Sequence, residues 1–184
     1  MRSIFIIVMI MATGTVSPLF SSAVKLSAVG GKVGPVLSSI DKENTLSIGL
    51  SMDFHNVLPN IIVSPYFEFW SADFKKDQIE NWDWQVYALG ISAIGLFNLN
   101  NSKAIPYVGG GVGFNFNSWS VTFTDNRSPK PRDYEFDLAI HALSGIELPL
   151  SAKVNSYLEL KFVLAGVTDY FGFWFGLKYK FDTR

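Results

Sequence analysis

The chain has 184 residues, a net charge of −1 and no cysteine, which excludes disulfides, thiolate metal sites, cysteine nucleophiles and lipid attachment to a cysteine. A net charge near zero also argues against a basic surface that would hold nucleic acid by counterion release. Hydrophobic residues make up 48% of the chain, yet after Ala23 no apolar run approaches the roughly 20 residues of a membrane-spanning helix.

The N-terminal segment has the three parts of a secretory signal peptide. Arg2 supplies a positive charge, an apolar run extends from Ile4 to Met11, and residues 21–23 are small and suited to cleavage. A membrane anchor is the alternative, but the apolar run is too short to cross a bilayer. We therefore predict a signal peptide at residues 1–23 and one mature domain at residues 24–184.

The mature region consists of short strand-like segments separated by turn residues, with almost no 3.6-residue periodicity. Pro35 and Pro65 lie inside two of these segments, where a missing N–H is costly, so we expect a bulge or a shifted strand end at each. The fourth segment does not separate into two faces, and a bulge near Gly90 would reconcile it. The eight predicted strands are 26–36, 45–54, 61–71, 83–97, 106–118, 134–148, 153–164 and 171–181.

Four of these strands alternate clearly between a bulky apolar face and a face of small or polar residues. The apolar face of strand 45–54 comprises Leu46, Ile48, Leu50, Met52 and Phe54. No charge falls on the apolar face of the four strands, which matters because Arg or Lys at the bilayer midplane costs about 2 to 4 kcal/mol. Bulky residues suit lipid, and small or hydrogen-bonding residues suit a narrow lumen.

This alternation leads to an all-β prediction. A soluble, lipocalin-like ligand carrier would also alternate, but so many bulky side chains would overfill its interior. We predict a closed, antiparallel, up-and-down transmembrane β-barrel of about eight strands in the outer membrane, with outer-membrane lipid around it. Eight strands leave an interior about wide enough for side chains to fill, so little or no conductance is expected.

Two of the predicted connections are long and polar, at residues 73–81 and 122–133. With both termini in the periplasm, these connections lie outside the cell, as outer-membrane barrels have them. Their mixed charge suits an extracellular partner, and equally suits simple solvation. We take solvation as the default.

Residues 106–116, PYVGGGVGFNF, resemble a central strand of the small outer-membrane β-barrel family of OmpA/OmpX type. Near the chain end, Gly176, Tyr179 and Phe181 resemble that family's assembly signal, although many members stop at the aromatic residue and this chain continues to Arg184. The resemblance implies a Gram-negative cell envelope protein, recognised by the barrel-insertion machinery. It implies placement more than activity. We predict a monomer with a structural or surface-interaction role, and no specific activity can be inferred.

The small residues of the fifth strand and the tryptophans near the strand ends predict two packing features. Gly109, Gly111 and Gly113 share one face and would leave room for large groups from neighbouring strands, such as Tyr66, Trp174 or Lys178. Four tryptophans near the outer strand ends are expected to form the aromatic girdle at the membrane boundary, and a ligand platform is the alternative. They are Trp70, Trp82, Trp84 and Trp119.

Charged residues that face inward must pair or hydrogen-bond once withdrawn from water. We therefore predict a structural lumen network that joins acids on the sixth and seventh strands to lysines on the seventh and eighth. The residues with inward parity are Asp53, Glu68, Glu135, Asp137, His141, Glu147, Glu159, Lys161, Lys178 and Lys180.

An enzymatic alternative starts from His141, Ser144 and Glu147, because some small outer-membrane barrels are lipid A deacylases that use His, Ser and Glu. The period of two puts Ser144 on the face opposite the other two, which breaks any relay. His55 is the only other histidine, so metal binding has no better support. No catalytic, cofactor or metal site is predicted.

Overall fold

The computed structural model describes residues 25–39, 45–58, 61–76, 80–97, 99, 102–123 and 132–181. The predicted signal peptide lies outside these residues. None of the described segments forms a helix of the length and apolarity needed to span a membrane.

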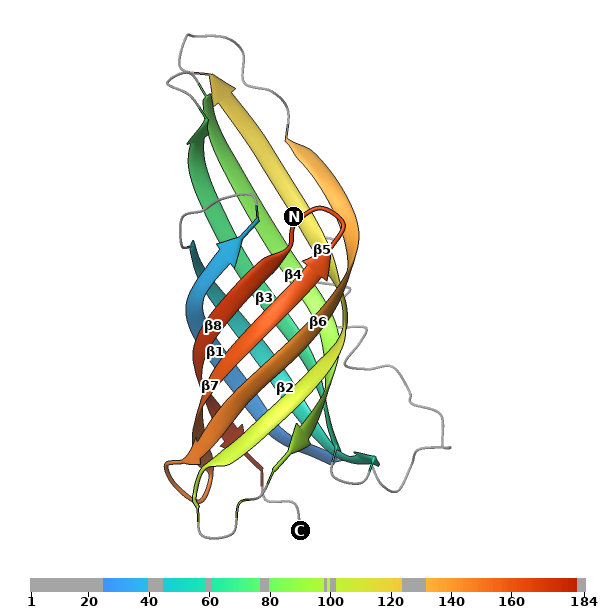
Figure 1. The fold of residues 1–184 in the computed structure, drawn as a ribbon, viewed down its shortest axis with the longest axis vertical. Helices are drawn as coiled ribbons and strands as arrows, with labels where there is room; N and C mark the ends of the chain where they lie inside the picture. The colour runs from blue at the N-terminus through green and yellow to red at the C-terminus, as the bar shows by residue number, and fades with distance from the viewer. Residues whose placement is uncertain are drawn as a thin grey trace.

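Eight antiparallel strands form one closed barrel, in which each strand pairs with its neighbours in the sequence (Figure 1). β1 pairs with β8 and so closes the barrel. The predicted up-and-down, all-β barrel of eight strands is confirmed. The strands are β1 (Lys25–Ser38), β2 (Thr45–Leu58), β3 (Ile61–Lys76), β4 (Glu80–Leu96), β5 (Ile105–Phe123), β6 (Asp133–Pro149), β7 (Val154–Ala165) and β8 (Tyr170–Lys180).

The two ends of the barrel differ in height. At the near end, β1 begins and β8 ends. At the far end, β3 to β6 rise beyond the shorter β7 and β8 (Figure 1, top). We call this extension the tall wall. It comprises residues 70–76, 80–86, 117–123 and 133–135.

The tall wall corrects the predicted connections. β3 runs to Lys76 and β4 starts at Glu80, so most of the segment predicted as a loop at 73–81 is strand. β5 likewise runs to Phe123. The parts of the two predicted loops at 77–79 and 124–131 lie outside the described residues. Polar strand ends above a membrane lack the apolar face by which the sequence reveals a strand.

No bulge lies at either proline or at Gly90. Pro35 is opposite Leu46, and Pro65 is opposite Ile91, in uninterrupted register. Gly90 pairs in register with both neighbouring strands, so the predicted bulge in the fourth strand is wrong. The observed register shifts lie in β1–β2 near residues 26–28 and in β2–β3 between residues 54 and 58.

β4 has two distinct faces after all. Val86, Ala88, Ser92 and Ile94 are buried within the barrel and Gly90 faces inward with them, while Tyr87, Leu89, Ile91 and Ala93 face outward. Inward Val and Ile beside outward Leu and Ile obscure the pattern, because both faces are then apolar.

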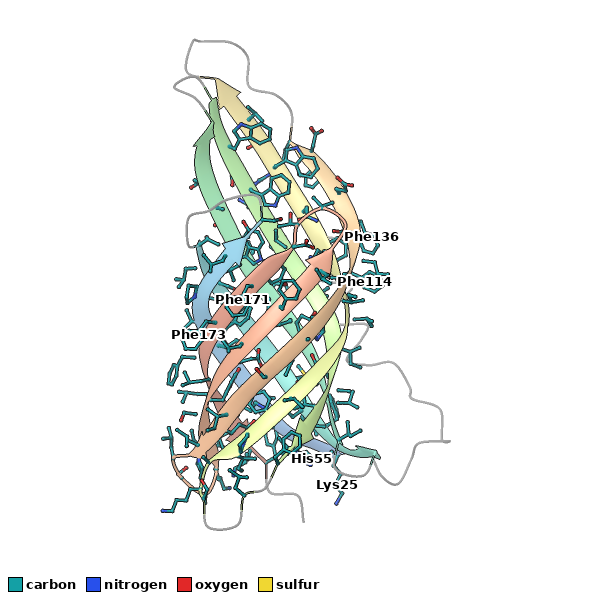
Figure 2. All side chains as sticks on the ribbon, viewed as in Figure 1. Lys25, His55, Phe114, Phe136, Phe171 and Phe173 are labelled. Atoms are coloured by element: carbon teal, nitrogen blue, oxygen red, sulfur yellow. The ribbon has the colours of Figure 1, made fainter. Side chains whose placement is uncertain are left out.

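Bulky apolar side chains cover the outside of the barrel as a belt (Figure 2). Leu46, Leu50 and Leu138 are each at least 60% exposed. The predicted outward parity of the second, sixth, seventh and eighth strands is therefore confirmed. Phe114, Phe136, Phe171 and Phe173 are among the belt residues that Figure 2 labels.

The belt ends abruptly at the base of the tall wall. Its last row across β3 to β6 is aromatic and consists of the cross-strand partners Phe69, Tyr87, Phe116 and Phe136. The next outward row is polar on β3 to β5. It contains Ser71 and Gln85, with Ser118 beside Gln85 in the register but buried, and the row above contains Asp73, Asp83 and Ser120. An aromatic row bounded by polar residues marks a membrane–water interface.

The predicted tryptophan girdle is wrong. Trp70 and Trp84 are buried inside the barrel, and Trp119 packs against the same inner cluster. Trp82 shares the inward parity of Trp84. The girdle on these strands is made of phenylalanine and tyrosine.

Candidate functional site

Four charged side chains meet in the near half of the lumen, from β1, β3 and β7. Lys32 Nζ lies 2.6 Å from Glu68 Oε1 and 2.6 Å from Glu159 Oε1. Lys161 Nζ lies 2.8 Å from the same Glu68 oxygen. All four side chains are buried, and two cations balance two anions. We call this group the lumen quartet.

Tyrosines satisfy the remaining groups of the lumen quartet. Tyr170 donates a hydrogen bond of 3.3 Å to Glu68, and Tyr107 donates one of 3.2 Å to Glu159. Lys161 Nζ also lies 3.4 Å from the centre of the Tyr66 ring, within cation–π range. A buried ion pair is tolerable only when such additional contacts satisfy its lone pairs and protons.

A second charged cluster lies closer to the near end. Lys178 Nζ is 2.9 Å from Asp53 and 2.5 Å from Glu147. Ser64 donates to Asp53, and Asn155 Nδ2 donates to Glu147 at 3.0 Å. One lysine here faces two carboxylates, so this cluster carries a net charge of −1. We call it the lumen triad.

His141 does not take part in a catalytic relay with Ser144 and Glu147. Ser144 shares the outward face of β6, and Glu147 belongs to the lumen triad. His141 Nε2 instead lies 2.8 Å from Ser92 Oγ, and its Nδ1 lies 3.3 Å from the Tyr66 hydroxyl. Both Ser92 and His141 are more than nine-tenths buried in the lumen. The other partner of the imidazole is the phenol of Tyr66 and not a carboxylate. This arrangement fixes the imidazole as part of the lumen packing.

The far half of the lumen is filled by aromatic and apolar side chains. Trp70, Tyr170 and Trp174 are at most 2% exposed. The Trp84 and Trp119 rings stack 4.7 Å apart, and a Cβ at Gly172 would overlap the ring of Trp174. This far-half plug closes the lumen, completed by Val36, Ala72, Val86, Ala139 and Val163.

A cavity of about 320 Å³ opens at the near end, below the lumen triad. We call it the vestibule. Lys25 and His55 lie there at the foot of the barrel (Figure 2). Its lining comes from all eight strands and comprises Lys25, Ser27, Ala28, Asp53, His55, Ile62, Leu96, Ile105, Glu147, Asn155, Lys178, Lys180 and Phe181.

The structure brings together six of the residues predicted for the lumen network and places His141 beside them. The six are Asp53, Glu68, Glu147, Glu159, Lys161 and Lys178. The acids come from β2 and β3 as well as from the two predicted strands.

Three predicted residues lie outside the network. Glu135 is exposed at the far end. Asp137 accepts hydrogen bonds from Gly166 N and Val167 N, and so anchors the β7–β8 connection. Lys180 lines the vestibule.

Sequence reasoning missed Lys32. The first strand alternates poorly because Val and Gly occur on both faces. Its period of two nevertheless places Lys32 in line with Gly30, Gly34 and Val36, all of which face inward. A charge at the middle of a strand was therefore the signal that would have identified it.

The inward glycines of β5 leave room for large neighbouring side chains. Of the three predicted neighbours, only Tyr66 lies against them. A Cβ at Gly113 would lie 2.7 Å from the Tyr66 hydroxyl oxygen. Gly111 instead faces His141, whereas Trp174 covers Gly172. In the stretch predicted as an assembly signal, Gly176 lies against the Tyr157 ring. Tyr179 and Phe181 are outward, with ring centres 5.5 Å apart.

No cluster of three or more potential metal-ligating side chains occurs within the described ranges.

No protein-family model matches the sequence, and no curated protein matches it. Solved structures do match. Neisserial surface protein A is 15% identical, with a TM-score of 0.66 over 87% of this chain and 100% of that one. A major outer membrane protein from Thermus thermophilus is 10% identical, with a TM-score of 0.64 over 84% and 99%. The attachment invasion locus protein of Yersinia pestis is 12% identical, with a TM-score of 0.57 over 86% and 99%. The chain therefore has the fold of small outer-membrane β-barrel proteins.

Proposed function

We propose that this protein is an outer-membrane β-barrel with a structural or surface-interaction role and no enzymatic activity of its own. The apolar belt carries the proposal. On β3 it extends from Ile61 to Phe69, nine residues, which is the length of a tilted strand that crosses a bilayer. A soluble monomer rarely exposes an apolar surface of this extent.

The height of the two ends gives the orientation. The near end, where β1 begins at Lys25 and β8 ends at Lys180, faces the periplasm, and the tall wall stands outside the cell. Export through a cleaved signal peptide at residues 1–23 and recognition of Gly176, Tyr179 and Phe181 by the insertion machinery belong to the same proposal. Partners outside the cell would meet the tall wall and the connections at its top.

The filled lumen supports a role without transport or catalysis. The far-half plug leaves no open path for ions between the described strands. A lipid-modifying enzyme needs its reactive groups at the lipid boundary, whereas His141 and Ser92 lie in the closed interior. A lipocalin-like carrier needs an open apolar interior, and the near half is charged.

Cell fractionation tests the location. The full chain is expressed, the outer membrane is extracted with detergent, and the protein is run on a gel unheated and boiled. Recovery in the outer membrane with a mobility shift on boiling is expected for a closed barrel. Recovery in the soluble periplasm without detergent would contradict the proposal.

A matched pair of arginine substitutions tests the belt itself. Ile140→Arg lies in the middle row of the belt and is expected to lower the free energy of unfolding in lipid vesicles by about 2 to 4 kcal/mol. Ser120→Arg, two outward rows above the aromatic row on the neighbouring strand, should change it by less than about 0.5 kcal/mol. Equal effects would place the membrane elsewhere on the barrel.

A further inference from the structure

The vestibule has the size of a small-molecule site and is left open by the side chains of the described residues. Its volume of about 320 Å³ falls within the range of ligand pockets, roughly 300 to 1,000 Å³. Every strand contributes to its wall, so the closed barrel holds its shape rigidly. The lumen network does not use this space.

The rim of the vestibule offers positive charge. The side chains of Lys180 and His55 make no hydrogen bond or ion pair with the described residues, and Lys25 lies beside them, engaged in an interaction of its own. The described connections at the near end add Lys103 and Lys153 and no acid. Among the described residues at this end, a ligand therefore meets cations before it reaches the lumen triad.

One residue in the floor of the vestibule has a hydrogen-bond acceptor without a donor. Asn155 is 3% exposed, and its Oδ1 has no hydrogen-bond partner among the described residues. Its Nδ2 is committed to Glu147, so Oδ1 is the amide atom left without a partner in a residue that lines the cavity. A buried acceptor without a donor is costly, so it indicates that a ligand supplies the missing hydrogen-bond donor.

We propose that the vestibule binds the free carboxyl end of a peptide with an apolar terminal side chain. The carboxylate pairs with Lys180 at the rim, and a backbone N–H reaches Asn155 Oδ1. Apolar wall residues receive the side chain. These are Ile62, Leu96 and Ile105.

Other anions fit this arrangement less well. A phosphate dianion brings more negative charge toward the lumen triad, whose net charge is already −1, and it brings no donor for Asn155. An ionised fatty acid has the carboxylate and the apolar part but likewise lacks a donor. A peptide end supplies the anion, the N–H and the apolar group together.

The test uses the full barrel in detergent micelles and the peptide N-acetyl-Ala-Ala-Phe with a free carboxyl group. Binding is followed by calorimetry and by the NMR signals of the Asn155 side-chain amide. Saturable binding is expected, and the same peptide with an amidated C-terminus should bind roughly tenfold more weakly. Equal binding of the two peptides would overturn the proposal, as would the absence of binding at millimolar concentration.

Matched variants separate the vestibule from general attraction to a basic rim. Lys180→Gln should weaken binding roughly tenfold, whereas Lys103→Gln removes the same charge from the same end outside the cavity and should leave affinity unchanged. Equal losses in both variants would overturn the site. Asn155→Leu should weaken the peptide but not octanoate or inorganic phosphate. Tighter binding of either of those anions to the unaltered protein would also overturn the proposal.

This inference does not depend on the proposed membrane location. The fractionation experiment can fail while the peptide binds, and the peptide can fail to bind to a protein that fractionates with the outer membrane.

Discussion

The two halves of the lumen fill the same narrow space with opposite chemistry. In the near half, the lysines and carboxylates of the lumen quartet and the lumen triad pair at 2.5 to 2.9 Å. In the far half, aromatic rings meet glycine and alanine with hardly any charge. The comparison teaches that the near half is specified by charge pairing and the far half by volume.

Loss of one charge should produce the largest effect. Glu68→Ala leaves Lys161 buried without its anion, and this is expected to lower the free energy of unfolding by about 3 to 5 kcal/mol. Urea unfolding in micelles, followed by tryptophan fluorescence, measures it. Glu135→Ala is the control, because Glu135 is exposed and should change stability by less than about 0.5 kcal/mol.

A charge-based near half also predicts partial rescue. The double variant Glu68→Met with Lys161→Met removes both partners and should be more stable than Glu68→Ala alone. A double variant that is less stable would mean that shape, and not charge, specifies the near half.

Truncation of a large side chain in the far half should lower the free energy of unfolding nearly as much. The loss should depend on the volume that is removed. Trp174→Ala opens a cavity in the plug and is expected to lower the free energy of unfolding by about 3 to 5 kcal/mol. Trp174→Phe should lose clearly less in the same urea experiment. Equal losses would show that the indole N–H, and not the volume, matters.

Added volume in the far half should have an intermediate effect. Gly172→Ala places a methyl group within the ring of Trp174 and is expected to cost about 1 to 3 kcal/mol. Gly31→Ala is the matched control, because the nearest atom to its Cβ would be 3.9 Å away. Similar midpoints for the two variants in urea would contradict tight packing of the plug.

An exposed ion pair should matter least. Arg132 lies 3.1 Å from Asp83 on the outer face of the tall wall, with both side chains more than a third exposed. Arg132→Ala should change stability by less than about 1 kcal/mol, because water competes for both charges. A loss of stability as large as that of Glu68→Ala would contradict the expectation that a buried ion pair matters more than an exposed one.

The sequence predicts the outward, apolar half of this molecule better than its interior. The belt residues follow one rule, that none of them is charged, and strands such as 45–54 and 171–181 obey it residue by residue. The lumen obeys no such rule. Trp70 and Trp84 fill space there although their residue type also suits a girdle, and only the pairing of neighbouring strands separates the two roles.

Long-range geometry explains what else was missed. Lys32 reaches Glu159 across 127 residues of sequence, and no local pattern encodes that distance. The vestibule is likewise invisible in any one strand, because its lining is gathered from all eight. Alternation along each strand identifies which residues face inward. Pairing of the strands in the closed barrel determines which of these residues contact one another.

The lumen triad also has a consequence for the order of assembly. Asp53 lies on β2 and Glu147 on β6, and their shared cation, Lys178, arrives only with β8, the last strand of the chain. An incomplete barrel would hold two carboxylates without a counterion. Closure of the β1–β8 seam and the pairing of these two carboxylates with Lys178 are thus one event, which favours the closed position of the final strand.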